Sequence, residues 1–175
     1  AVKNTNTKII KYLYNTFKEK IDINDILLLA AENSNIAILK SIYTTFKDQI
    51  KIYTLLLPPV KRNILQLILT ALKNEIDVNR QDIDGNTILM LAVKKKKISL
   101  IQNLCDIFKD TIKINKQNKN GDTVIMLTTQ DNVNVEILQF LCDTFQNKID
   151  INQQNIYGET AFMLAAYKNT NIEVI

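Results

Sequence analysis

The sequence predicts an all-α fold, a solenoid of stacked helical repeats with short β-hairpin fingers in its C-terminal repeats only. A phrase made of glycine, a polar residue, threonine and an apolar run occurs three times. Its glycines are 36 and 37 positions apart (Gly85, Gly121 and Gly158). A period of this size is typical of stacked supersecondary units. Only 3 of the 175 residues are glycine and 2 are proline, which favours short loops and a largely helical chain.

A second phrase sets the limits of the repeats. Isoleucines at positions 21, 50, 76, 112 and 149 each follow a Phe or Leu by four residues, with steps of 29, 26, 36 and 37. The predicted repeats of this single array are 1–23 (partial), 24–52, 53–78, 79–114, 115–151 and 152–175 (partial). The early repeats are shorter because Asn24 to Ala30 spans 6 positions where Asn79 to Ala92 spans 13. We therefore expect fingers only from residue 79 onward.

Each full repeat is predicted to contain a finger and two helices. Asx and glycine turn chemistry marks the finger at residues 79–85. Thr87 is expected to cap a first helix from Ile88 to about Lys94. A longer amphipathic helix then follows from about Ser99 to Phe108, because its apolar residues recur at helical spacing. The counterparts of this second helix are Ile9–Phe17, Ile38–Phe46, Ile64–Leu72 and Ile137–Phe145. Pro58 and Pro59 should shorten the first helix of the third repeat.

The two ends of the chain are predicted to fall inside repeats. Ala1 aligns with Ala30 and Ala92, at the end of a first helix, and Ile175 falls within a second helix. Neither end carries the polar capping repeat that such arrays use. We therefore expect the chain to be part of a longer array.

These phrases resemble the ankyrin repeat family. Residues 82–92 are similar to its pattern of an acidic turn, glycine and Thr-Pro-Leu-His-x-Ala, and Ile76-Asp77-Val78-Asn79 is similar to its closing Ala-Asp-Val-Asn. The resemblance covers all 175 residues and is strongest from Ile76 to Ala166. It implies a fold of paired helices and a protein-binding face made by the finger tips and the first helices.

The sequence also departs from the family pattern. Methionine replaces the usual histidine at positions 90, 126 and 163, so the usual Thr–His hydrogen bond should be absent and the thioether should supply adaptable apolar packing. The usual glycine at the end of the second helix is replaced by Lys20, Gln49, Glu75, Thr111 and Lys148. Termination there should depend on another group, such as a neighbouring Asn or Asp. Asn79, Asn115 and Asn152 resemble family asparagines that undergo hydroxylation, but we favour turn asparagines that bond backbone groups.

Catalysis and cofactor binding are disfavoured by the composition. The chain contains no histidine, which removes the commonest general base and transition-metal ligand. The three glycines are too far apart for a phosphate-binding loop. Cys105 and Cys142 occupy equivalent places in successive helices and are expected to be buried free thiols. We predict no enzyme, no metal and no cofactor.

The cellular setting and the charged patches follow from similar arguments. No apolar run approaches the ~18 residues of a membrane span, and residues 1–10 lack a signal-peptide pattern. The sequence predicts an intracellular, cytoplasmic protein, or one in the host-cell cytosol if it is a secreted effector. The net charge is +4, and the one basic run, Lys94–Lys97, is interpreted as a solvated turn. Nucleic acid is therefore a disfavoured partner.

The candidate partner-binding residues flank the glycine of each finger or end the first helices. Variation between repeats there can encode specificity, and Tyr157 and Tyr167 are the best anchors. The candidates are Ile83, Asp84, Asn86, Lys94, Lys95, Lys119, Asn120, Asp122, Gln130, Asp131, Ile156, Tyr157, Glu159, Tyr167 and Lys168. The bland alternative is that these positions are ordinary solvated surface, with Tyr157 packed on a neighbouring finger.

The leading hypothesis is a non-catalytic protein–protein interaction module. Ankyrin-type arrays often serve as host-targeting proteins of intracellular bacteria and viruses, and the Asn-, Lys- and Ile-rich composition is compatible with that role. The alternatives are a structural spacer, a segment that self-associates through its uncapped ends, and a targeting arm for an enzyme domain outside this chain.

Overall fold

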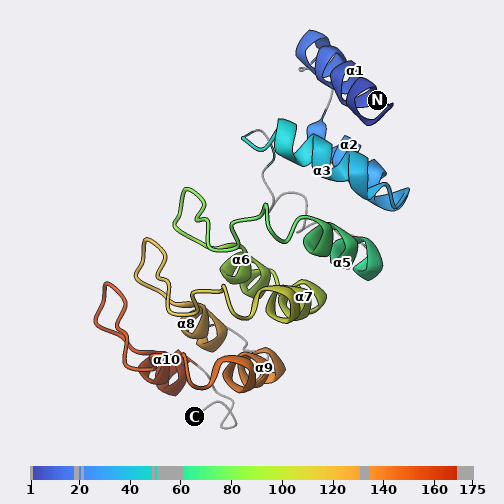
Figure 1. Ribbon diagram of the computed structural model, residues 1–175. Helices are drawn as coiled ribbons and strands as arrows, with labels where there is room; N and C mark the ends of the chain where they lie inside the picture. The colour runs from blue at the N-terminus through green and yellow to red at the C-terminus, as the bar shows by residue number, and fades with distance from the viewer. Residues whose placement is uncertain are drawn as a thin grey trace. The chain divides into compact units, whose positions relative to one another are not determined.

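The computed structural model describes residues 2–17, 20, 22–48, 50, 61–130 and 135–168. It divides into two compact units, Ala1–Ile76 and Asp77–Ile175, which we call the N-terminal unit and the C-terminal unit. The described residues form α-helices joined by turns and loops, with no strand among them (Figure 1). The all-α class is therefore confirmed. The division into six repeats stays a prediction, and Pro58 and Pro59 lie outside the described residues.

The N-terminal unit is organised around α3 (Ile36–Thr45). This helix packs against α1 (Val2–Phe17), α2 (Ile23–Glu32) and α5 (Arg62–Ala71). Its core includes side chains at most 1% exposed: Leu27, Leu39, Ile42, Ile68 and Leu69. The helix predicted over Ile9–Phe17 begins earlier, because α1 is one continuous helix from Val2. Residues 2–8 contain no glycine or proline that would end a helix.

The C-terminal unit alternates short and long helices. The short ones are α6 (Ile88–Lys94), α8 (Val124–Thr129) and α10 (Ala161–Lys168), and the long ones are α7 (Ile98–Phe108) and α9 (Val135–Phe145). Contacts join α6 to α8 and α8 to α10, while α7 packs on α6 and α9 packs on α8 (Figure 1). The predicted first helix and its Thr87 cap are confirmed, and the second helices begin one to two residues earlier than predicted.

The threonine caps use methionine in a way that the sequence did not predict. The Thr87 hydroxyl accepts a hydrogen bond from Met90 N (3.3 Å), and Thr87 N donates to Met90 Sδ (3.3 Å). Thr123 and Met126 repeat this pair, at 3.2 and 3.5 Å. Thioether sulfur is a weak acceptor, yet here it satisfies a buried donor. Met90 and Met126 are each 1% exposed, so the expected apolar packing is confirmed for these two repeats, and the hydrogen bond to sulfur adds to it.

Two helices end on a left-handed residue that is not glycine. Ser34 after α2 and Lys96 after α6 both have φ of 52°. Asn35 N donates to Ala30 O and Ser34 N to Ala31 O, both at 2.9 Å. This is the Schellman pattern, which satisfies carbonyls at a helix C-terminus and usually places glycine at the left-handed position.

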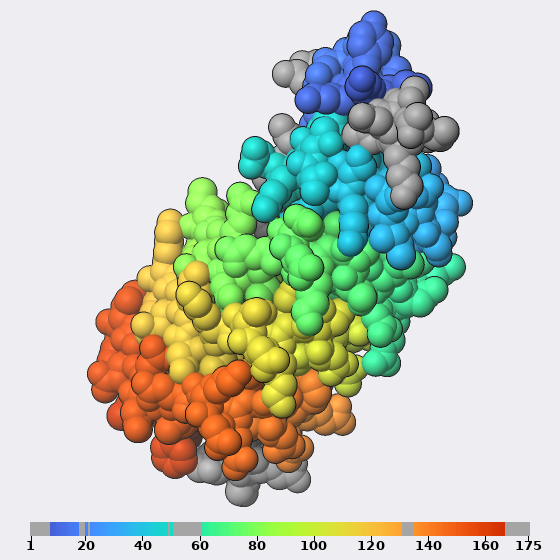
Figure 2. Space-filling model, viewed as in Figure 1, coloured from blue at the N-terminus to red at the C-terminus, as the bar shows by residue number. Residues whose placement is uncertain are grey.

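The fingers are loops rather than β-hairpins. We define the first finger as residues 79–86, the second as 115–122 and the third as 152–159. Within the first finger, Asp82 N donates to Asn86 O (2.9 Å) and Gly85 N donates to Asp82 O (3.0 Å). These bonds close a turn without a ladder, so the predicted β-hairpin form is not confirmed. Figure 2 shows the three loops in contact, coloured from green to orange.

Candidate functional site

Each finger is folded around one carboxylate or carboxamide oxygen. In the second finger, Asn118 Oδ1 accepts hydrogen bonds from the backbone N–H groups of Asn120 (3.0 Å) and Asp122 (2.9 Å). Asp82 and Asn155 hold the other two fingers in the same way. Short polar side chains favour such local bonds, which fix the tip without any strand.

The glycine of each tip has positive φ, between 75° and 79°. A Cβ added at Gly85 would lie 2.8 Å from Lys119 N, and one added at Gly121 would lie 2.7 Å from Ile156 N. A Cβ added at Gly158 would have no neighbouring atom within 4 Å. The first two glycines are therefore required both by conformation and by the close approach of the next finger.

Hydrogen bonds join each finger to the next. Lys119 N donates to Asp84 O and Ile156 N donates to Asn120 O, both at 3.0 Å. Side chains add a parallel link beneath the tips. Asn118 Nδ2 donates to Asn86 Oδ1, and Asn155 Nδ2 donates to Asp122 Oδ1, both at 3.2 Å. The three tips therefore form one hydrogen-bonded row.

A pair of glutamines forms a further link that sequence reasoning missed. Gln81 Nε2 donates to Gly85 O in its own finger and to Gln117 O in the next (2.8 Å). Gln117 Nε2 donates to Gly121 O (2.6 Å) and to Gln154 O (2.8 Å). The available signal was glutamine at positions 81, 117 and 154, which are separated by the repeat period.

The junction asparagines clamp the following repeat. Asn79 Nδ2 donates to Thr111 O and Asn79 Oδ1 accepts from Lys113 N, both at 2.8 Å. Asn115 makes the same pair of bonds to Lys148 O (2.7 Å) and Asp150 N (2.9 Å). The interpretation as asparagines that bond backbone groups is confirmed for these two. The clamps also donate hydrogen bonds to the carbonyl groups of Thr111 and Lys148, two of the residues that replace the usual family glycine.

The structure exposes most of the predicted partner-binding residues. Ile83 is 83% exposed, Ile156 63% and Tyr157 73%. Tyr157 is therefore not packed on the second finger. Gln130 and Glu159 are half-buried. The other exposed candidates are Asp84, Lys94, Lys95, Lys119 and Asn120.

Two of the candidates are buried. Asn86 is 2% exposed and Asp122 5% exposed, because each accepts a bond from the amide of the next finger. Their side chains stabilise the row and are not available to a partner, which corrects the prediction. Asp131 lies outside the described residues, as do the side chains of Tyr167 and Lys168.

The finger tips and the helix ends are separate parts of the predicted surface. The backbone bonds between fingers bring Asp84, Lys119, Asn120 and Ile156 together. Lys94 lies at the opposite end of the seven-residue helix α6, which is about 9 Å from the finger base at 1.5 Å per residue. Glu159 is held back from the tip by the amide of Asn155, which donates to its Oε2 (2.8 Å).

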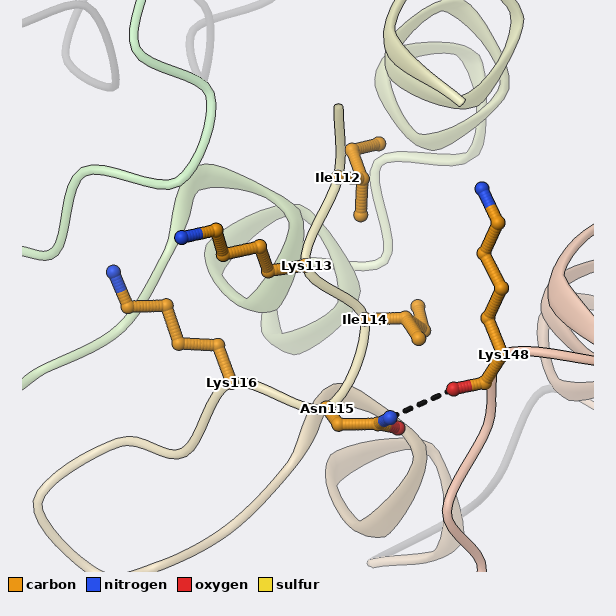
Figure 3. Close-up of a pocket in the computed structure, with 6 residues that line it drawn as sticks. All are labelled: Ile112, Lys113, Ile114, Asn115, Lys116 and Lys148. Atoms are coloured by element: carbon orange, nitrogen blue, oxygen red, sulfur yellow. Dashed lines mark hydrogen bonds between the residues drawn. The ribbon is translucent and has the colours of Figure 1, made fainter. Parts of the chain in front are cut away.

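A hollow of about 350 Å³ adjoins the second clamp (Figure 3). Its lining consists of Ile112, Lys113, Ile114, Asn115, Lys116 and Lys148. Two of the lysines already have partners within the protein. Lys116 Nζ donates to Asn79 O (2.8 Å), and Lys148 Nζ lies 4.0 Å from Asp110 Oδ1. The hollow therefore offers few free groups to a ligand.

Several further observations concern chemistry and membranes. Cys105 and Cys142 are free thiols, with Cys105 buried and Cys142 half-buried. Burial, with a smaller contribution from Asp106, raises the pKa of Cys105 to about 12. Within the described ranges, no group of three or more Cys, Asp or Glu side chains could hold a metal ion. No helix in that part of the chain is long and apolar enough to cross a membrane.

Part of the chain matches a model of a known protein family. The family model described as "Ankyrin repeats (3 copies)" matches residues 103–175. These residues include the second and third fingers and helices α8, α9 and α10. No curated protein matches the chain.

Proposed function

We propose that the finger tips of the C-terminal unit bind a partner protein, on the premise that residues 103–175 match a family model of ankyrin repeats. Ankyrin repeats are generally protein–protein interaction modules. The proposed contact residues are Ile83, Asp84, Lys119, Asn120, Ile156 and Tyr157. The surface extends to Lys94, Lys95 and Gln130 at the ends of α6 and α8. The proposed role is non-catalytic.

The exposure of large apolar side chains on immobilised tips carries this proposal. Ile83, Ile156 and Tyr157 are all more than 60% exposed, and they add nothing to the core. The hydrogen bonds between fingers hold their backbones in place. A preorganised surface loses less conformational freedom when it binds, and tyrosine offers a large contact area with a polar end. Lys119 lies between the isoleucines in the row and adds a charge that can select a partner.

We place this interaction in a reducing, intracellular compartment. The two cysteines are free thiols, and disulfides are rare in such compartments. A structural spacer would need no exposed apolar tips, so the same residues distinguish the two hypotheses.

Affinity purification with a matched pair of variants tests the proposed function. The tagged chain would be used to recover proteins from the cells that make it, in parallel with the double variant Ile83→Ser/Tyr157→Ser. Ile98→Ser is the control, because Ile98 is 41% exposed at the start of α7 and away from the fingers. We expect the recovered partner to bind the double variant at least tenfold more weakly, since buried aromatic anchors dominate interfaces.

The opposite result has a clear form. A folded double variant that binds the same partner with unchanged Kd would place the interaction elsewhere. If no partner is recovered and the sedimentation coefficient of the chain depends on its concentration, self-association would become the favoured function in place of partner binding.

A further inference from the structure

Each later finger in the row is bonded on one side to the finger before it. In the second finger, Lys119 N donates to Asp84 O, and Gln117 O accepts from Gln81 Nε2. The third finger is bonded to the second in the same way. One backbone N–H and one carbonyl, two residues apart, therefore mark the side of a finger that faces its predecessor.

In the first finger the two corresponding groups are unpaired. Ile83 N and Gln81 O make no hydrogen bond to any residue that the structure describes. Ile83 is 83% exposed and Gln81 is half-buried. We call this side of the first finger, formed by residues 80–83, the outer edge of the row.

The length of the preceding repeat explains why the outer edge has no finger beside it. In the repeat of the first finger, 18 positions separate Asn79 from the N-cap of α7, Lys97. In the preceding repeat, 8 positions separate the corresponding residue, Tyr53, from the N-cap of α5, Lys61. That difference exceeds the length of a finger. The outer edge therefore lies inside the sequence, after the repeats that are too short to contain a finger.

A difference between the fingers also suits an edge. Asn118 and Asn155 donate their Nδ2 to the preceding finger, whereas the first finger has Asp82 at this position. Asp82 Oδ1 accepts the two bonds that hold the tip, so its Oδ2 takes the place of the amide nitrogen. Oδ2 has no hydrogen bond or ion pair to another described residue. The outer edge therefore presents an acidic group where the later fingers present a donor.

Arg80 adds a basic side chain to the outer edge. Its counterpart in the second finger, Lys116, reaches back to the first finger, where its Nζ donates to Asn79 O (2.8 Å). Arg80 is exposed, and within the described ranges its side chain has no hydrogen bond or ion pair. Its guanidinium is therefore free to donate to a carbonyl of a molecule beside the first finger.

We propose that the outer edge binds an extended segment of the partner protein that carries a lysine or arginine. An extended backbone presents both N–H and C=O groups, so it can accept from Ile83 N and donate to Gln81 O, as in strand addition to a sheet edge. The basic side chain pairs with Asp82, and Arg80 donates to a further carbonyl. A helix does not fit, because its backbone groups are bonded to one another. This inference rests on the proposed function, since it names the part of the partner that meets the first tip.

Overlapping synthetic peptides that cover the sequence of the recovered partner supply the probe. Each peptide carries a fluorophore, and its binding to the full chain is measured by fluorescence anisotropy. Binding of the whole partner is measured in parallel. We expect a peptide with a lysine or arginine to bind saturably, and its affinity to fall with added salt.

Two substitutions at one position separate the backbone donor from the side chain. Ile83 is the second residue of the turn that the bond from Gly85 N to Asp82 O closes (3.0 Å), and proline is favoured at this position of a turn. Ile83→Pro therefore removes the N–H group and keeps the turn. Ile83→Ala is the matched control, because it removes the same apolar side chain and keeps the N–H group. Asp82→Asn removes the charge and keeps the oxygen that holds the tip.

We expect the peptide to bind Ile83→Pro at least about tenfold more weakly than Ile83→Ala, because a carbonyl of the peptide loses its donor. Asp82→Asn should also weaken binding and reduce its dependence on salt. Circular dichroism verifies that each variant is folded. If Ile83→Pro does not fold, Asp82→Asn decides, and unchanged binding by that variant would overturn the inference.

The remaining outcomes separate this inference from the proposed function. Equal binding by Ile83→Pro and Ile83→Ala would overturn the inference and leave the proposed function standing. The same holds if the whole partner binds but none of its peptides does. If no partner is recovered, the proposed function and the inference both fail.

Discussion

At the scale of single residues, carboxamide and carboxylate groups link the loops of the C-terminal unit, whose described residues form no strand. Asn79 and Asn115 each donate to a carbonyl and accept from an N–H two residues later. A carboxamide can make both bonds because it carries a donor and an acceptor. Aspartate cannot donate, so asparagine is required at these junctions.

We expect Asn115→Ala to lower the free energy of unfolding by about 1–2 kcal/mol, because two hydrogen bonds are lost at about 1 kcal/mol each. Asn152→Ala is the matched control. Asn152 is exposed, and its side chain has no bond to another described residue, so a change within about 0.5 kcal/mol is expected. Urea unfolding measures both variants, and equal effects would mean that the clamp contributes nothing.

A pair of glycines allows the cost of the backbone conformation to be measured apart from the cost of a clash between fingers. Gly121 and Gly158 share a φ of 75°, but only Gly121 faces the backbone of the next finger. We expect Gly158→Ala to cost about 1–2 kcal/mol for the left-handed conformation. Gly121→Ala should cost about 1–3 kcal/mol more, as overpacking does. Thermal unfolding of the two variants gives the difference, and a difference of zero would contradict the observed approach of Ile156.

The buried thiol makes a prediction about pH. Because its pKa is raised to about 12 from an ordinary value of 9.0, Cys105 should resist iodoacetamide at pH 8, where only a thiolate reacts. It should react after unfolding in urea. The folded chain holds the thiol proton more tightly than the unfolded chain does. The stability that Cys105 contributes is therefore fully present below about pH 9, and it is lost as the pH rises to about 12. Peptide mass spectrometry of the treated chain measures the extent of alkylation at each cysteine.

At the scale of elements, the helices are defined by local signals that the sequence carries. Thr87 and the apolar run after it predicted α6 with its observed bounds, because caps and helical periodicity act within one turn. The fingers were predicted as β-hairpins, since a short polar turn with glycine suits either a hairpin or a loop. The bonds within each finger close only a turn, and further backbone bonds run to the neighbouring fingers. A local sequence pattern does not contain information about these bonds between fingers.

The end of α2 offers a stabilising substitution. Ser34 has φ of 52°, where a residue with a Cβ is strained by about 1–2 kcal/mol. Ser34→Gly removes this strain but adds about 0.5–1 kcal/mol of unfolded-state entropy. We expect a net gain of about 0.5 kcal/mol, seen as a higher urea midpoint at unchanged slope. A lower midpoint would show that Ser34 makes a contact worth more than the strain.

At the scale of the whole molecule, repetition allows the sequence to predict architecture better than surface. The period located the fingers, and it assigned the same role to Asp84 and Asn86. The structure separates them, because Asp84 is exposed whereas Asn86 is buried against the second finger. Burial of this kind arises only when two repeats pair.

The central claim is that the finger row binds a partner protein, and site-specific photocrosslinking tests it most directly. A photoreactive amino acid would be placed at position 157 on the third tip, and separately at position 98 at the start of α7. Illumination in the native cells should yield a covalent adduct with one partner protein from position 157 and none from position 98. An adduct from position 98 alone, or equal adducts from both positions, would contradict the claim.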